Sequence, residues 1–84
     1  MPQKGQVVYS AAGHDKDSFY VVVQVEEDGA CRIADGKRRR LASPKRKNPK
    51  HLRLTRSVID LGQIGSDKAL RRALAALPRS PAEE

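Results

Sequence analysis

The sequence predicts a small, mainly β domain, in which four or five short strands form a barrel or a curled sheet and one C-terminal α-helix follows. Three observations support this fold class. Short apolar runs, separated by turn residues, recur at spacings of roughly 8 to 12 residues in the first two thirds of the chain. The apolar spacing becomes helical near residue 66. A chain of 84 residues holds one modest core, which leaves little stability to spare for a deep catalytic pocket.

Two strands are expected in the first third of the chain. The runs GQVVYSAAG (5–13) and SFYVVVQVEE (18–27) are rich in β-branched and aromatic residues, and turn residues bound both of them. In the second run Val21, Val23 and Val25 share one face, and the polar residues near its end share the other. We therefore expect these valines to face the core and the opposite side of the strand to face water.

A tight hairpin is predicted around the third strand. The run ACRIA (30–34) forms this strand, and Asp35-Gly36 follows it. An Asp-Gly dipeptide suits a type I′ turn, in which both central residues have positive φ. We therefore predict KRRRLA (37–42) as a fourth strand, paired antiparallel with the third. This prediction places three consecutive arginines on a hairpin.

An exposed loop and a closing strand are expected next. Pro44 and Pro49 lack the backbone N–H that a regular strand ladder needs, so residues 43–50 are predicted as an exposed loop. The run HLRLT (51–55) alternates again and predicts a short closing strand. The segment 56–65 carries apolar residues without a clear period, and no secondary structure is assigned to it.

A C-terminal helix is predicted over residues 66–77. Ser66 suits the N-cap, the aspartate after it suits the first turn, and Pro78 ends the helix. The apolar stripe consists of Leu70, Ala73, Leu74 and Leu77. A lone helix of this length is marginal in water, so we expect the stripe to dock on the strands. In the alternative, the leucines contact another protein and the two arginines of the helix extend the basic surface.

The positive charge is concentrated in the middle of the chain. Seventeen Lys and Arg against ten Asp and Glu give a formal net charge of +7. Residues 35–56 hold ten basic groups and one acidic group, whereas residues 1–34 carry a net −2 and residues 57–84 a net 0. A run with no interspersed carboxylates to offset it favours a polyanionic partner. The alternatives are a solvated loop that only aids solubility and a nuclear-localisation signal.

A resemblance to a known family rests on three stretches: GQVVYSAAGHDKDSFYVVVQV, RIADGKRRRL and PKRKNPKHL. Together they resemble the KOW-type RNA-binding proteins, most closely the bacterial small KOW proteins related to the fourteenth large-subunit ribosomal protein of archaea and eukaryotes. The resemblance covers residues 5–55, with Gly5 opening the first strand and Gly13 bending the first loop. Asp17 departs from the family, in which a second glycine often occupies that loop. The resemblance implies an SH3-like β-barrel that binds RNA through its basic loops.

The basic loops are the predicted RNA-binding site. The main contacts are expected from Arg38, Arg39, Arg40, Lys45, Arg46, Lys47, Lys50 and Arg53. Secondary contacts are expected from His14, Lys16 and His51. Such cations would contact phosphates, which position an RNA but carry no sequence information. The predicted binding therefore has a strong salt dependence.

Base stacking is a weaker hypothesis than phosphate binding. The chain has three aromatic residues, Tyr9, Phe19 and Tyr20, and at least one of the last two is expected in the core. Tyr9 or Tyr20 on the surface could stack a base, but buried packing is the preferred interpretation. So few aromatic side chains favour recognition of the shape and backbone of structured RNA.

Neither an enzymatic site nor a metal or cofactor site is predicted. Cys31, His14 and His51 lack the spacing of a zinc site. Cys31 and Ile33 are expected on the inner face of the third strand, where the thiol acts as a small apolar group. The pair His14-Asp15 has no nucleophile near it in a recognisable motif.

The predicted organisation is a KOW-type, SH3-like barrel over 1–56, a connecting segment over 57–65, a docked helix over 66–78 and a flexible tail over 79–84. The sequence has no apolar run of membrane-spanning length and no signal-peptide pattern. We therefore expect a cytoplasmic protein, and a monomer. The resemblance to KOW proteins implies association with the ribosome, a role in translation and RNA, chiefly ribosomal RNA, as the partner. The alternatives are a protein-interaction module of the translation or transcription machinery and a non-specific nucleic-acid binder.

Overall fold

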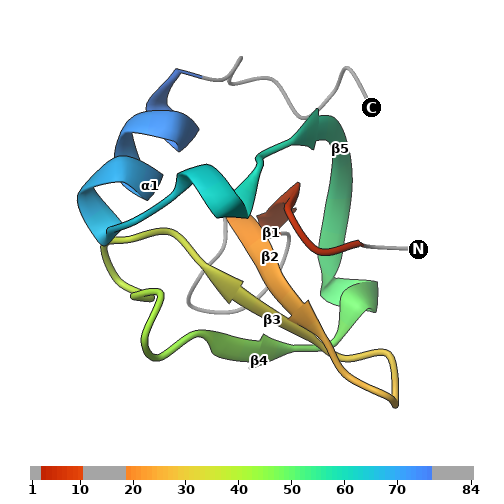
Figure 1. The fold of residues 1–84 in the computed structure, drawn as a ribbon. Coiled ribbons are helices and arrows are strands. Elements are labelled where there is room, and N and C mark those ends of the chain that lie inside the picture. Colours follow the sequence, from red (N-terminus) through yellow and green to blue (C-terminus); the bar gives the residue numbers. More distant parts are fainter. Residues whose placement is uncertain (1–2, 11–18, 77–84) are drawn as a thin grey trace.

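The computed structural model describes residues 3–10 and 19–76. Within these residues, five strands form one antiparallel sheet in the order β4-β3-β2-β1-β5, and a short helix lies near the C-terminus (Figure 1). The strands are β1 (Gln6–Ser10), β2 (Phe19–Val25), β3 (Cys31–Ala34), β4 (Lys45–Lys47) and β5 (Leu52–Val58). The helical elements are the 3-10 turns η2 (Pro49–His51) and η3 (Leu61–Gln63) and the helix α1 (Asp67–Ala75). The prediction of a mainly β domain with a C-terminal helix is confirmed.

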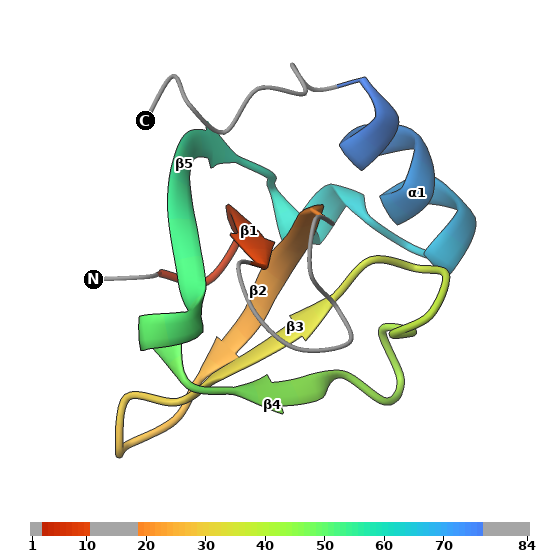
Figure 2. The ribbon, with the colours of Figure 1, turned by 180° about the vertical axis from the view of Figure 1, so that it is seen from behind.

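The sheet is open but strongly curled. β3 pairs with both β4 and β2, and its register aligns Lys47 of β4 with Val25 of β2. In the same way, β1 aligns Arg53 of β5 with Phe19 of β2. In a flat sheet Lys47 and Arg53 would be roughly 20 Å apart along the strands and a further ~19 Å apart across them. Residues 48–52 join them, and such a connection reaches at most about 20 Å when fully extended. The two edges must therefore approach each other, and both views show them meeting at η2 (Figures 1 and 2).

Both faces of the sheet are buried along its middle. The inner cluster contains Val8, Tyr20, Val22, Cys31, Ile33 and Leu52. On the other face, Val21 and Ala34 form a second cluster with Leu70 of α1. Successive residues of a strand point to opposite faces, so β2 contributes to both clusters. The helix and the segment after β5 thus give the sheet a second core.

The predicted orientation of the β2 valines is only partly right. Val21 is fully buried and Val23 is half-buried, but the side chain of Val25 is 37 % exposed. Val22, predicted to face water, is fully buried in the inner cluster. The register against β3 also shifts between Val22 and Gln24, which interrupts the simple alternation. A period of two cannot reveal that a distant helix covers the second face.

The predicted fourth strand is wrong. Residues 37–42 form turns and bends, and the strand that pairs with β3 is β4, within the segment 43–50 that was predicted as a loop. The turn at Gly36 does have the expected positive φ of 77°. Pro44 and Pro49 do not prevent pairing, because they lie on either side of the three residues of β4 at the sheet edge.

The closing strand and the helix agree with the sequence pattern. The strand predicted over 51–55 is β5, which continues to Val58 and pairs with β1. Ser66 is the N-cap of α1, and its hydroxyl accepts a hydrogen bond from the N–H of Ala69 at 3.1 Å. Leu70 is fully buried and Leu74 packs against the same cluster, so this stripe docks on the sheet. Leu77, the predicted stop and the predicted tail lie outside the described residues.

Candidate nucleic-acid interface

The arginine loop, which we define as residues 35–41, is closed by one aspartate. The carboxylate of Asp35 accepts hydrogen bonds from the N–H groups of Lys37 and Arg39, at 2.8 and 2.9 Å. The N–H groups of Asp35 and Gly36 donate to the carbonyl of Arg39, at 2.9 and 3.1 Å. An aspartate that bonds the backbone a few residues on offers the chain an alternative to a strand ladder. These bonds explain why the arginines lie on a compact loop and not on a hairpin strand.

Helix α1 holds the arginine loop in place. A Cβ atom at Gly36 would lie 2.4 Å from the carbonyl oxygen of Asp67, so only glycine fits there. The guanidinium of Arg71 donates to the carbonyl of Gly36 at 2.6 Å. The N–H of Leu41 donates to the carboxylate of Asp67 at 2.8 Å. The loop is thus attached to the helix through both its ends.

The arginine loop presents most of its predicted contacts to solvent. Arg38 and Arg40 are exposed, as is Lys37, and none of the three forms an ion pair within the described part of the chain. Arg39 is half-buried, as is Leu41. Two of the three predicted arginines are therefore available to an anionic ligand, and the third is only partly accessible.

Arg46 differs from the arginines of the loop because acidic groups surround it. Its Nε lies 2.7 Å from a carboxylate oxygen of Glu26, and its Nη2 pairs with Asp28. The second oxygen of Glu26 pairs with Nε of Arg32 at 2.7 Å. The expectation that no carboxylate offsets the basic run is therefore wrong at this position. The acidic groups come from the turn between β2 and β3, which the fold brings beside β4.

The charges of this cluster stabilise one another. Hydrogen bonds from Arg46 and then Arg32 lower the pKa of the Glu26 carboxyl below its ordinary value. The pKa of Asp28 is lowered first by the N–H of Ala30, which donates to its carboxylate at 3.0 Å, and then by the charge of Arg46. The pKa of Arg46 is raised in turn, chiefly by its hydrogen bond to Glu26. A phosphate would have to compete with two carboxylates for this guanidinium.

The remaining predicted contacts divide between β4 and the corner at η2. Lys45 and Lys47 lie opposite Ile33 and Cys31, share their face of the sheet and are half-buried. The corner residues Lys50, His51 and Arg53 are all exposed. The acidic turn between β2 and β3 lies at the same corner in both ribbon views (Figures 1 and 2). His14 and Lys16 fall outside the described residues.

The aromatic and cysteine residues pack inside the sheet. Tyr20 is fully buried in the inner cluster, so the hypothesis that it stacks a base is wrong. Tyr9 is half-buried, and its ring packs edge-on against Phe19 with 5.3 Å between the centroids. Cys31 is fully buried, as predicted, and burial raises the pKa of its thiol. In the described ranges, no three His, Cys, Asp or Glu side chains gather where they could hold a metal ion.

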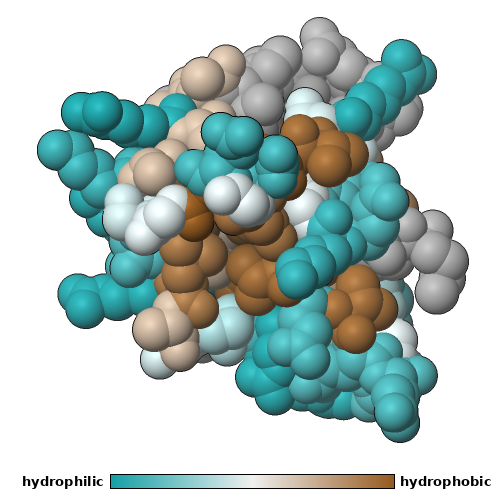
Figure 3. Space-filling model, viewed as in Figure 1, coloured by the Kyte–Doolittle hydropathy of each residue, from teal (hydrophilic) through white to brown (hydrophobic). Residues whose placement is uncertain are grey.

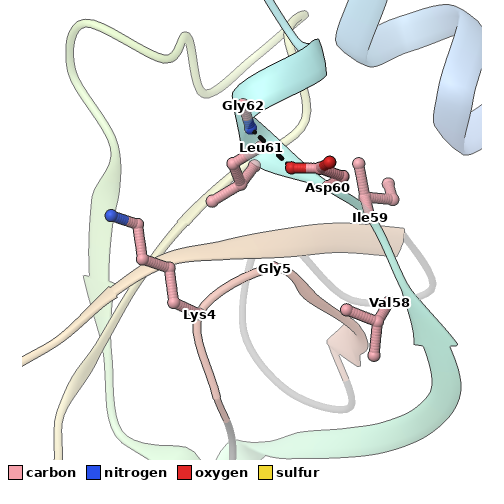
Figure 4. Close-up of a pocket in the computed structure, with 7 residues that line it drawn as sticks. All are labelled: Lys4, Gly5, Val58, Ile59, Asp60, Leu61 and Gly62. Carbon is pink, nitrogen blue, oxygen red and sulfur yellow. Dashed lines mark hydrogen bonds between the residues drawn. The ribbon is translucent and has the colours of Figure 1, made fainter.

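The sequence did not reveal a shallow apolar cleft of about 640 Å³ beside β5 (Figure 4). Gly5 forms part of its floor. The N–H of Gly5 donates to the carbonyl of Val22 and its carbonyl accepts from the N–H of Ile59, both at 2.7 Å, and these two bonds hold the glycine between β2 and the segment after β5. Val58 at its rim is 57 % exposed, and apolar residues gather near the centre of the face that Figure 3 shows in the view of Figure 1. The cleft is lined by Lys4, Gly5, Val58, Ile59, Asp60, Leu61 and Gly62. Its two walls are far apart in the sequence, so no local pattern predicts it.

The comparison with known proteins finds no protein-family model and no curated protein that matches this chain. Among the helices that the structure describes, none has the length and apolar character needed to cross a membrane.

Proposed function

We propose that this protein is a non-enzymatic RNA-binding protein of the KOW type that acts at the ribosome in the cytoplasm. The observation that carries the proposal is the arginine loop: exposed Arg38 and Arg40 on a loop that is closed by hydrogen bonds and attached to α1. A preorganised cationic loop loses little conformational entropy when it meets an anion. The resemblance of residues 5–55 to KOW proteins supplies the choice of RNA among polyanions.

An SH3-like barrel is the proposed family fold. The five antiparallel strands and the strong curl of the sheet support it, as does the short connection through η2 between the two edge strands. In a small barrel of this kind the loops carry the binding residues while the strands supply a rigid scaffold. The arginine loop and the corner at η2 are such connections.

The proposed mechanism is electrostatic docking onto RNA phosphates. Arg38 and Arg40 make the principal contacts, and Lys50 and Arg53 make contacts at the second basic corner. Phosphate contacts position the RNA and give affinity, while the shape of the duplex determines where the protein sits. Arg46 is left out of the contacting set, because Glu26 and Asp28 already occupy its guanidinium.

A binding experiment tests the loop directly. The variant R38Q/R40Q should bind a structured RNA hairpin more weakly than the wild type. Its slope of log affinity against log salt should be shallower by about 1.4–1.8, since each lost phosphate contact removes about 0.7–0.9. An unchanged slope would remove the arginine loop from the site. Equal affinity of the wild type for duplex DNA and RNA hairpin at one salt concentration would instead indicate a non-specific nucleic-acid binder.

The ribosomal part of the proposal needs a separate experiment. Crosslinking of the protein to RNA in cells, followed by sequencing of the bound RNA, should enrich ribosomal RNA over its abundance in the input. R38Q/R40Q, expressed at the same level, should lose most of that enrichment. Enrichment of other transcripts alone would leave RNA binding intact and refute the ribosomal assignment.

A second candidate function is a protein-interaction module of the translation or transcription machinery. The apolar cleft and exposed Val58 favour it, because an exposed apolar patch beside a cleft is typical of a protein contact. If this function is correct, the complex with a protein partner should persist at high salt and in the variant R38Q/R40Q, and it should be lost in the variant Val58→Asp. The opposite pattern supports RNA as the principal ligand.

A further inference from the structure

We propose that α1 is part of the RNA-binding surface, so that the arginine loop and the helix form one composite phosphate-binding ridge. This inference rests on the proposed function and adds Lys68, Arg71 and Arg72 to the contacting residues. It differs from the sequence-based alternative, in which the helix arginines extend the basic surface only when the leucines bind another protein. In the structure the leucine stripe docks on the sheet.

The arginine loop is in direct contact with α1. Arg71 donates to the carbonyl of Gly36 at 2.6 Å, and Gly36 lies against the backbone of Asp67. The first two turns of α1 are thus in direct contact with the start of the arginine loop. Both ribbon views place the loop and α1 side by side, on the side of the molecule opposite β5 (Figures 1 and 2).

The basic side chains of α1 lie outside the face that packs on the sheet. Leu70 and Leu74 mark the face that packs on the sheet. At 100° per residue, Arg71, Lys68 and Arg72 follow one another within about 100° around the helix, starting beside that face. Asp67 and Arg71, which touch the loop, lie on the same flank. The three basic side chains of α1 therefore continue the surface from the arginine loop without a break.

Among the described residues, no ion pair engages the cations of this ridge. Lys68, Arg71 and Arg72 are exposed, as are the basic residues of the loop. The two carboxylates nearby, Asp35 and Asp67, accept backbone hydrogen bonds. Neither forms an ion pair within the described residues. In Figure 3 hydrophilic side chains project from this edge of the molecule. The ridge is composed of Lys37, Arg38, Arg40, Lys68, Arg71 and Arg72.

The shape of the ridge favours a phosphate backbone over a compact anion. Lys68 and Arg72 lie about 6 Å apart along the helix axis. Along a DNA duplex the phosphates of one strand follow one another every ~3.4 Å, so this distance corresponds to about two steps of one strand. A row of cations on a helix and an adjoining loop therefore suits one strand of a structured RNA. The ligand class is the phosphate backbone of RNA, and the ridge makes no prediction about base sequence.

The test separates the charge of the helix from its support of the loop. In K68Q/R72Q both changes are at exposed helix positions whose side chains form no hydrogen bond with the described residues, so the fold should be retained. The control K4Q/R56Q removes the same charge from exposed positions at the N-terminus and on β5, on the opposite side of the molecule. Circular dichroism and thermal unfolding establish that both variants are folded.

The readout is the salt dependence of binding to a structured RNA hairpin. K68Q/R72Q should reduce the slope of log affinity against log salt by about 1.4–1.8, whereas K4Q/R56Q should leave it unchanged. Equal slopes for the two variants would overturn the composite ridge. If R38Q/R40Q weakens binding and K68Q/R72Q does not, the inference fails while the proposed function stands. If the wild type does not bind RNA, both fail.

A second measurement keeps the inference testable if K68Q/R72Q is unstable. Titration of the wild-type protein with the RNA hairpin should shift the NMR signals of the backbone amides of α1 together with those of residues 37–40. Shifts confined to the corner at Lys50 and Arg53 would exclude the ridge. Tighter binding of a polyglutamate peptide than of the hairpin would indicate an acidic protein partner, and this outcome would also overturn the proposed ligand class.

Discussion

The arginine loop and the strand β4 carry similar sequences but present their charge differently. Arg38 and Arg40 are exposed on a loop whose carboxylate, Asp35, is used by the backbone. Arg46 is also exposed, yet its guanidinium is shared between Glu26 and Asp28. Both segments add the same charge to the sequence count. The arginine loop leaves Arg38 and Arg40 available to a ligand, whereas two carboxylates engage Arg46, so a count of basic residues overstates the binding surface.

The largest expected effect concerns the packing of α1, the helix that holds the arginine loop, on the sheet. Leu70→Ala should lower the free energy of unfolding by about 2–5 kcal/mol, because it removes a fully buried side chain and leaves a cavity between helix and sheet. Urea denaturation measures the change. Val58→Ala, at an exposed position, is the matched control and should cost far less. Similar costs for the two variants would show that the helix is not part of the cooperative core.

A smaller effect tests the contact at Gly36. Gly36→Ala should cost about 2–3 kcal/mol, because the new Cβ meets the carbonyl of Asp67 in addition to the strain of positive φ. Gly29→Ala is the control, since Gly29 has a φ of 89° but no atom within 4 Å of the new Cβ. That variant should cost about 1 kcal/mol. If chemical denaturation gave the two variants the same loss in free energy of unfolding, the loop would not contact the helix at Gly36.

The comparison between the two basic segments is tested by single charge removals. Arg40→Gln should reduce the salt slope of RNA binding by about 0.7–0.9, the value of one phosphate contact. Arg46→Gln removes the same charge and should leave the slope nearly unchanged, because acidic groups neutralise that guanidinium in the free protein. A loss of slope in Arg46→Gln as large as in Arg40→Gln would mean that RNA displaces the carboxylates.

The smallest expected effect is a pH dependence of stability that belongs to the β4 cluster. The pKa values of Glu26 and Asp28 are lowered in the folded state, so the unfolded state binds more protons near their ordinary values. Their stabilisation is therefore fully present at neutral pH and is lost as the pH falls below about 4. Urea midpoints should fall less steeply on acidification in E26Q/D28N than in the wild type. Parallel pH profiles would contradict this assignment.

Several elements of the fold were predictable because neighbouring residues determine them. The alternation in 5–13 and 18–27 predicted β1 and β2, and the Ser66 N-cap predicted the start of α1. The positive φ at Gly36 followed from the Asp-Gly dipeptide. The prediction of a strand over 37–42 was wrong because the carboxylate of Asp35 accepts hydrogen bonds from the loop backbone. An Asp-Gly dipeptide permits this loop as well as a hairpin turn.

The candidate site was predictable as a set of basic residues but not as a surface. Arg38, Arg40, Lys50 and Arg53 are exposed as expected. The half-burial of Arg39 depends on how the loop folds, and no sequence signal gave the contact between the loop and α1. Lys68, Arg71 and Arg72 become part of the same ridge only because Gly36 meets the first turn of the helix.

By itself, the sequence determined where most strands and the helix begin, and where its positive charge is concentrated. These features depend on residues within a few positions of one another, whose periods and turn preferences can be read directly. The tertiary structure alone decided which charges remain available. Arg46 is paired across 20 residues with Glu26 and across 18 with Asp28, and Arg71 reaches across 35 to Gly36. Such pairs form only when the curl of the sheet brings distant turns together, because an ion pair or a hydrogen bond acts through space and not along the chain.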